Sequence, residues 1–168
     1  MHTINERKKQ MASSSKNLSR HSERNIGNIK DKKFAVIVSE WNEEVTESLY
    51  NGALETLLRY GVDKQNIIRK AVPGSFELSL GAQWMAEKTE IDAVICLGCV
   101  IQGETRHFDF ICNAVAHGLT EVGLKYNKPV IFGVLTPDNQ QQALDRAGGK
   151  HGNKGDEAAV SAIKMLGF

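Results

Sequence analysis

The sequence predicts an α/β fold, a three-layer α/β/α sandwich built around a parallel sheet of four strands. Two observations support this prediction. Short apolar runs rich in β-branched residues alternate along the chain with stretches whose apolar residues recur at helical spacing. The strongest runs are apolar throughout, as expected for strands buried on both faces. Strands joined by helices in this way form a parallel sheet that helices cover on each side.

The first half of the domain is predicted to contain two strand–helix pairs. Residues 34–39 (FAVIVS) predict a buried strand. A helix follows and ends at Gly61, and its apolar face consists of Val45, Leu49, Ala53, Leu57 and Leu58. Residues 66–72 (NIIRKAV) predict a weaker strand. The next helix fades by Lys88, and its apolar positions are Phe76, Leu80 and Trp84.

The second half begins with the strongest strand signal of the chain, residues 92–101 (DAVICLGCVI). The helix after it is predicted from the apolar positions Ile111, Val115, Leu119 and Val122. Residues 128–136 (KPVIFGVLT) predict the fourth strand. Residues 143–147 and 158–166 predict two further helical stretches, separated by the glycine-rich segment AGGKHGNKG. No internal repeat is evident.

Composition narrows the class of protein. A chain of 168 residues, 41% hydrophobic and 24% charged, is typical of one globular domain with a full core. The formal charge of +1 gives no reason to expect nucleic acid or a membrane surface as a partner. No run approaches the roughly 18 apolar residues of a membrane span. Three cysteines do not indicate a disulfide framework, so a reducing cytoplasm is the expected location.

Residues 1–30 differ from the rest of the chain. They contain seven Lys and Arg against two Asp and Glu, and few large apolar residues. Such a segment cannot bury enough surface to offset its ordering entropy, so we expect a disordered basic tail at 1–30 and a folded domain at 31–168. An organellar transit peptide is an alternative, because those segments are also basic and rich in serine. Met11 is an alternative start of the natural chain.

The predicted architecture places a ligand site at the carboxyl ends of the strands. After the third strand, the segment GETRH offers Gly103 for a sharp turn, free N–H groups at a helix start, and the Thr105 hydroxyl. Together they suit an anion. The alternative is that Thr105 or Asp109 only caps the helix. No nucleotide phosphate-loop pattern occurs. His107 could shuttle protons beside such an anion, although a lone histidine is more often structural.

Three other segments carry candidate binding groups. Trp41 follows the first strand, where an indole can stack on a flat heterocycle or pack into a core or interface. Ser75 and Glu77 suit a polyhydroxylated or uracil-like ligand, or simply begin a helix after the Pro73–Gly74 turn. Arg146 and Lys154 bracket the glycine-rich segment and could clamp a phosphate, or could be solvated surface charges.

The cysteines do not indicate a redox or metal site. The CLGC segment lies inside a predicted strand, so Cys96 and Cys99 would face opposite sides of the sheet. A redox pair usually needs a helix N-terminus, and a zinc site would lack its other ligands. We expect Cys96, Cys99 and Cys112 to fill the core.

Five segments, taken in order, resemble the lumazine synthase family of riboflavin biosynthesis, which has a flavodoxin-like fold. They span the chain from Phe34 to the C-terminal region: FAVIVSEWN, VPGSFELSLGA, GCVIQGETRHFDFICNAVAHGL, PVIFGVLT and ALDRAGGKHGNKGDEAA. The resemblance implies a transferase that condenses 5-amino-6-(D-ribitylamino)uracil with L-3,4-dihydroxy-2-butanone 4-phosphate. The products are 6,7-dimethyl-8-ribityllumazine, phosphate and water. It implies neither a metal nor an organic cofactor.

The resemblance also implies roles for individual residues. Trp41 matches the aromatic residue that stacks on the pyrimidine, and His107 matches the proton-transfer residue. Phe132 and Arg146 match residues that the neighbouring subunit contributes, and Arg146 binds the phosphate. The segment that holds the uracil and ribityl chain is matched by Ser75, Phe76 and Glu77, and the phosphate loop by Gly103, Glu104 and Thr105. Lys154 matches the lysine of the GNKG motif, and Glu157 the carboxylate after it. The expected substrate site also includes Asn42, Cys99, Val100 and Ile101.

Three positions depart from the family pattern. Trp41 replaces the commoner phenylalanine, and the larger ring would also favour flavin products. Glu104 stands where a small residue is usual, and Gln102 where arginine is frequent. Both changes lower the local positive field, so they bear on phosphate affinity.

The resemblance implies a pentamer, or twelve pentamers that form an icosahedral shell, with riboflavin synthase as a partner protein. The short segment from Ala147 to Lys154 favours the shell over a free pentamer or a decamer. Two other functions remain alternatives: a non-catalytic carrier of riboflavin or lumazine, and a generic flavodoxin-like domain that binds a phosphorylated ligand. Neither explains the sequence as well, because a carrier needs no His107 and a generic domain needs neither PGSFE nor GNKG.

Overall fold

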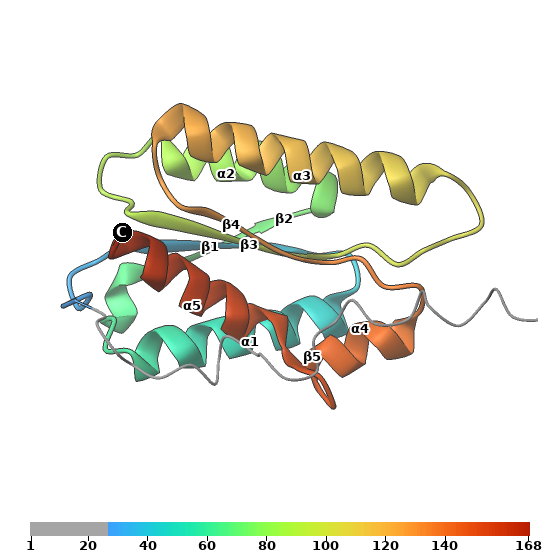
Figure 1. The fold of residues 1–168 in the computed structure, drawn as a ribbon, viewed down its shortest axis with the longest axis horizontal. Coiled ribbons are helices and arrows are strands. Elements are labelled where there is room, and N and C mark those ends of the chain that lie inside the picture. Colours follow the sequence, from blue (N-terminus) through green and yellow to red (C-terminus); the bar gives the residue numbers. More distant parts are fainter. Residues whose placement is uncertain (1–26) are drawn as a thin grey trace, which may run out of the picture.

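A computed structural model describes residues 27–168, so residues 1–26 of the expected tail lie outside the described part. Four parallel strands form the central sheet in the order β2-β1-β3-β4. Their bounds are β1 Phe34–Ser39, β2 Ile67–Val72, β3 Ala93–Cys99 and β4 Val130–Leu135. Helices cover both faces of this sheet (Figure 1), which confirms the predicted three-layer fold.

The helices divide between the two faces. Helices α2 (Leu78–Ala86) and α3 (His107–Tyr126) lie on one side, and α1 (Glu43–Arg59), α4 (Gln140–Arg146) and α5 (Lys154–Leu166) lie on the other (Figure 1). Short 3-10 turns, η2 (Lys64–Asn66) and η3 (Ser75–Glu77), precede β2 and α2. No helix of residues 27–168 combines the length and the apolar character that crossing a bilayer requires.

Side chains of β1 alternate between two apolar cores. Phe34, Val36 and Val38 are buried in the cluster that contains residues of α1 and α5, while Ala35 and Ile37 are buried in the cluster that contains residues of α2 and α3. Because neighbouring strand residues point to opposite faces, Ser39 continues the second set. The last residue of this strand therefore places a hydroxyl on the α2 side of the sheet.

Helices α1 and α5 pack closely where they cross. A Cβ atom at Gly155 would overlap the carbonyl oxygen of Leu49, so only glycine fits there. Asn153 fastens the same region: its Nδ2 donates to the Ser48 carbonyl at 2.9 Å, and its Oδ1 accepts from the Gly155 N–H at 2.8 Å. The start of α5 is thus fixed against α1.

Several element boundaries differ from those predicted. Strand β3 ends at Cys99 instead of residue 101, and α5 begins at Lys154, inside the segment expected to be a loop. That segment also forms a short antiparallel hairpin, β5 (Ala147–Gly149) with β6 (Gly152–Asn153). Gly148 and Gly152 have φ of 102° and 81°, values that glycine adopts freely.

The apolar stripe expected on the second helix is not its buried face. Phe76, Leu80 and Trp84 are each more than half exposed, while the buried residues of α2 are Leu78, Gly81, Ala82, Met85 and Ala86. The spacing predicted a helix correctly, but the residues that produced it do not form the buried face. Leu78 and Met85, together with the small residues Gly81, Ala82 and Ala86, pack against the sheet and α3 instead.

Two of the three cysteines fill the core as expected. Cys96 is buried in the α2 and α3 core and Cys99 in the opposite one, which confirms that they face opposite sides of the sheet. Cys112 on α3 is only half-buried, so the expectation for it was wrong. None of the three forms a disulfide.

Candidate functional site

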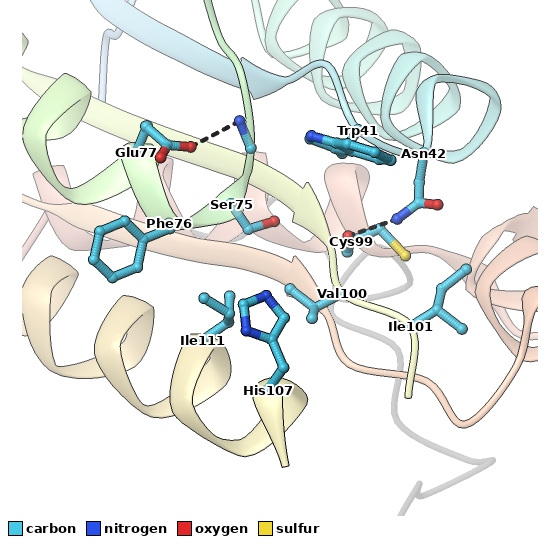
Figure 2. A pocket seen from close by; sticks show the side chains of 11 residues that line it. Trp41, Asn42, Ser75, Phe76, Glu77, Cys99, Val100, Ile101, His107 and Ile111 are labelled. Carbon is cyan, nitrogen blue, oxygen red and sulfur yellow. Dashed lines mark hydrogen bonds between the residues drawn. The ribbon is translucent and has the colours of Figure 1, made fainter. Parts of the chain in front are cut away.

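A cavity of about 610 Å³ opens at the carboxyl ends of β1 and β3, the position where parallel sheets bind ligands. Its volume is within the range of small-molecule sites. Figure 2 shows side chains from three separate loops around it. The lining residues are Trp41, Asn42, Gly74, Ser75, Phe76, Glu77, Cys99, Val100, Ile101, His107 and Ile111.

The loop after β1 presents Trp41 to this cavity. The indole is 73% exposed, so Trp41 is not a core tryptophan. Asn42 has φ 61° and ψ 46°, a left-handed conformation that asparagine tolerates better than most residues. Its Nδ2 donates to the Cys99 carbonyl at 2.9 Å, which ties this loop to the end of β3. The Asn42 amide therefore fixes the direction in which Trp41 projects.

The segment before α2 forms the opposite wall. Glu77 Oε2 accepts the Gly74 N–H at 2.9 Å, which closes the η3 turn. A Cβ at Gly74 would lie 3.3 Å from Trp41 Cδ1, so the indole packs directly against this backbone. Ser75 is buried, and its Oγ has no hydrogen-bond partner among residues 27–168. Phe76 lies at the rim of the cavity and is 56% exposed.

His107 is the first residue of α3 and lines the cavity from below in Figure 2. Its side chain is exposed, as are those of Glu104 and Thr105. The backbone N–H of His107 donates to Thr105 Oγ1 at 3.4 Å, but the N-cap position is Arg106 and no side chain caps the helix. The first turn of the helix therefore keeps free N–H groups that suit an anion.

Gly103 does not make the sharp turn expected of it. Its φ is outside the left-handed region, and a Cβ there would meet nothing within 4 Å. Neither conformation nor packing of the described chain therefore requires glycine at this position. Gln102 Nε2 donates to the Gly103 carbonyl at 2.9 Å, which turns that side chain back on its own loop.

Arg146, Lys154 and Glu157 form a cluster away from the cavity. Arg146 Nη2 lies 3.1 Å from both oxygens of Glu157, and Lys154 Nζ lies 3.2 Å from Glu157 Oε2. Both cations are therefore partly buried and paired with one carboxylate. Phe132 on β4 is partly exposed and also does not line the cavity. The cavity of one chain thus assembles the residues expected for the pyrimidine and His107. The predicted site residues that do not line it are Gly103, Glu104, Thr105, Phe132, Arg146, Lys154 and Glu157.

Two lining residues were not among those predicted. Gly74 was considered only as part of a turn, and its backbone N–H binds Glu77. Ile111 was used only as one of the apolar positions that predicted the helix, and it is half-buried and lines the cavity. Its position one turn after His107 is the signal that could have placed it there.

The lining groups do not suit a metal ion. Burial raises the pKa of the Cys99 thiol to about 11, so it is neutral near pH 7 and a weak ligand. Within residues 27–168, no cluster of three His, Cys, Asp or Glu side chains is arranged to hold a metal.

Comparison with known proteins gives one consistent result. The sequence profile of the 6,7-dimethyl-8-ribityllumazine synthase family matches residues 31–168. The 6,7-dimethyl-8-ribityllumazine synthase of Cytophaga hutchinsonii is 69% identical over 156 residues, which cover 93% of this chain and 98% of that protein. The proteins of the same name from Flavobacterium johnsoniae and Parabacteroides distasonis are 55% and 51% identical. These alignments cover 92% and 94% of this chain, and 82% and 99% of the relatives.

Proposed function

Because the chain belongs to the 6,7-dimethyl-8-ribityllumazine synthase family, we propose that the cavity beneath Trp41 is where it condenses 5-amino-6-(D-ribitylamino)uracil with 3,4-dihydroxy-2-butanone 4-phosphate. One observation supports this site above others. Loops that are distant in sequence bring an exposed indole, a buried serine hydroxyl and a histidine to one cavity of suitable volume. The indole stacks on the pyrimidine, and the segment from Ser75 to Glu77 holds its polar edge and the ribityl chain.

His107 moves protons during the reaction. The amine of the pyrimidine attacks the ketone, water leaves, phosphate is eliminated, and ring closure releases further water. The imidazole lies at the N-terminus of α3, where free N–H groups favour the phosphate. Gly103 leaves open space on the same loop, and Glu104 and Thr105 flank that space. Holding the two substrates together supplies most of the rate, and the histidine adds acid–base catalysis.

The site is completed by a second copy of the chain. Arg146 and Phe132 do not reach the cavity of their own chain, so a neighbouring subunit contributes them. The exposed residues Phe76, Leu80 and Trp84 continue from the cavity rim along α2 at a spacing of four, which makes one apolar stripe. Apolar stripes of this kind are typical of subunit contacts. A pentamer, and a shell of twelve pentamers, bury this stripe.

An absorbance assay tests the reaction. Purified protein is mixed with both substrates, and the lumazine chromophore should form faster than in a protein-free blank. Arg146→Ala should slow turnover steeply through a loss of phosphate affinity. A folded, assembled protein that gives no acceleration would overturn this function and favour the flavin carrier, which fluorescence titration with riboflavin would then detect.

Sedimentation tests the assembly. A species near five times 18.5 kDa is the pentamer, and a much larger particle is the shell. Trp84→Glu should shift the profile toward smaller species, whereas Leu58→Glu, an exposed leucine on the α1 side, should not. Riboflavin synthase as a partner and the cytoplasm as location also remain proposals; the absence of disulfides among Cys96, Cys99 and Cys112 supports the latter.

A further inference from the structure

Three serine hydroxyls are buried without a hydrogen-bond partner among residues 27–168: those of Ser39, Ser75 and Ser79. A buried hydroxyl that makes no hydrogen bond lowers stability, so each such group calls for a physical reason. Ser39 is completely buried, and Ser75 is nearly so. These two lie at the cavity end of the sheet, whereas Ser79 lies one turn further along α2.

Ser39 and Ser75 converge on Gly98. A Cβ atom at Gly98 would lie 2.6 Å from Ser75 Oγ and 3.3 Å from Ser39 Oγ, so both hydroxyls are close to one point above β3. The parallel register pairs Val38 with Leu97 and brings the next residue of β1, Ser39, beside Gly98. The missing side chain of Gly98 is therefore what allows the two hydroxyls to approach each other.

Only one of these residues lines the ligand site. Ser75 lines the cavity (Figure 2), but its Oγ is itself buried and reaches a ligand only when the side chain rotates about χ1. Ser39 lies behind it and does not line the cavity. Within the described chain the two oxygens are not hydrogen-bonded to each other, but rotation of the side chains about χ1 can bring them together.

We propose that Ser39 is a positioning residue that acts through Ser75 on the pyrimidine, an inference that rests on the proposed function. Ser39 donates its proton to Ser75 Oγ, because both hydroxyls lie beside Gly98 and neither has another hydrogen-bond partner among residues 27–168. Ser75 then directs its own proton into the cavity, toward a carbonyl oxygen of the heterocycle under Trp41. A hydroxyl that accepts one hydrogen bond is a stronger donor of the next, so Ser39 strengthens the contact that Ser75 makes.

Ser79 provides a matched control. Its hydroxyl is also buried without a partner among residues 27–168, and Ser79 lies on α2, the helix that follows Ser75. It faces Gly118 of α3, where a Cβ would overlap Ser79 Oγ, and it does not line the cavity. Ser79 as a whole is half-buried, but replacing it with alanine removes the same chemical group, also buried, without touching the ligand.

The experiment compares Ser39→Ala, Ser75→Ala, the double variant and Ser79→Ala. Ser39→Ala should raise KM for the ribitylaminouracil about 3- to 10-fold, the usual effect of one hydrogen bond, with kcat and the KM for the butanone phosphate within about twofold of wild type. Its urea midpoint should equal or exceed that of wild type, because an unpartnered hydroxyl is removed. Ser79→Ala should behave like wild type in all kinetic constants.

The double variant separates a positioning role from an independent one. Ser39→Ala should have no further effect on KM when Ser75 is already alanine, because Ser39 acts only through that hydroxyl. Multiplied effects in the double variant would overturn the proposal, and so would an unchanged KM in Ser39→Ala.

Direct binding of the pyrimidine, followed by tryptophan fluorescence, distinguishes this inference from the function on which it rests. Wild-type protein that binds the pyrimidine without turnover would overturn the proposed reaction, and the serine pair would still be tested by the dissociation constants. Wild-type protein that does neither would overturn both. Normal turnover with equal KM values in wild type and Ser39→Ala would overturn the serine pair alone.

Discussion

Arg146 and Glu157 are joined by two hydrogen bonds from one nitrogen. Nη2 of the guanidinium lies 3.1 Å from each carboxylate oxygen, while Nη1 donates to the carbonyl of His151 at 2.6 Å. These bonds connect the last residue of α4, the hairpin and the first turn of α5. Charge-assisted contacts of this kind fix the direction of a long side chain, so the remaining donors of Arg146 are held in a defined orientation.

Glu157→Gln should loosen Arg146 and weaken phosphate binding. Losing the carboxylate charge removes a charge-assisted pair, and we expect KM for the butanone phosphate to rise about 10-fold with little change in KM for the pyrimidine. The control is Asp156→Asn, the neighbouring acid of α5, which pairs with Arg59 at 3.3 Å and not with Arg146. Steady-state kinetics with each substrate varied in turn measures the two KM values in both variants. Equal effects of the two variants would contradict the role of Glu157.

His107→Ala should leave a slow but active enzyme. General acid–base catalysis contributes about 10²- to 10⁴-fold, while proximity of the substrates is retained, so we expect kcat to fall about 100-fold. His117 is the control, because it lies on the same helix, is exposed, and has its Nδ1 2.8 Å from the Asn113 carbonyl. His117→Ala should retain full kcat. Complete loss of turnover in a folded His107→Ala protein that still binds both substrates would contradict this prediction.

Two glycines should respond in opposite ways to alanine. Gly155→Ala forces a methyl group into the Leu49 carbonyl and should lower the free energy of unfolding by about 1–3 kcal/mol. In Gly103→Ala the added methyl group has no other atom within 4 Å, so the free energy of unfolding should stay within about 0.5 kcal/mol of wild type. Because the open space beside Gly103 is where we place the phosphate, its KM for the butanone phosphate should rise. Urea unfolding and kinetics together test the pair, and a destabilised Gly103→Ala protein would be the contrary result.

Stability should decrease at alkaline pH through the buried thiols. Burial raises the pKa of Cys99 to about 11, and it also raises the pKa of Cys96. A raised pKa means that the folded chain keeps its protons while the unfolded thiols ionise from about pH 9. The stabilising contribution is complete below pH 9 and is lost as pH rises toward 11, by about 2 kcal/mol for Cys99. Unfolding from pH 8 to 11 tests this, and Cys99→Ala should flatten the decline.

Trp41 should report ligand binding directly. Stacking of a base on an aromatic ring contributes about 1–3 kcal/mol, so Trp41→Ala should weaken pyrimidine binding about 10- to 100-fold, and Trp41→Phe only slightly. The chain has two tryptophans. Quenching of tryptophan fluorescence by the ligand should persist in Trp84→Phe and disappear in Trp41→Phe. The reverse pattern would place the heterocycle elsewhere.

Sequence patterns predicted the architecture because it depends on long periodic features. Residues 34–38 and 93–101 are apolar throughout, as expected for strands of a sheet that is covered on both sides. Boundaries were less predictable where local bonds decide them. Helix α5 begins at Lys154 because Asn153 caps it through the Gly155 N–H, and that bond depends on the tertiary contact of Asn153 with Ser48.

The site was predictable in part, for a related reason. Motif resemblance indicated the residues that line the cavity, such as Trp41 and His107, but not the hydrogen bonds between loops. The hydrogen bond from Asn42 to the Cys99 carbonyl joins two residues that are 57 positions apart in sequence. It forms only because β1 and β3 lie side by side in the sheet. Ser39 looked like an ordinary strand residue, and only its burial beside Gly98 shows that its hydroxyl has no partner among residues 27–168.

The bond from Asn42 to the end of β3 also bears on redesign of the protein. Since the sheet holds residue 42, a substitution at residue 41 exchanges the ring offered to a ligand without moving the point from which it projects. Libraries at position 41 would therefore sample ring size and polarity on a constant scaffold. A change at position 42 would shift the whole platform, and would alter preference for every heterocycle at once.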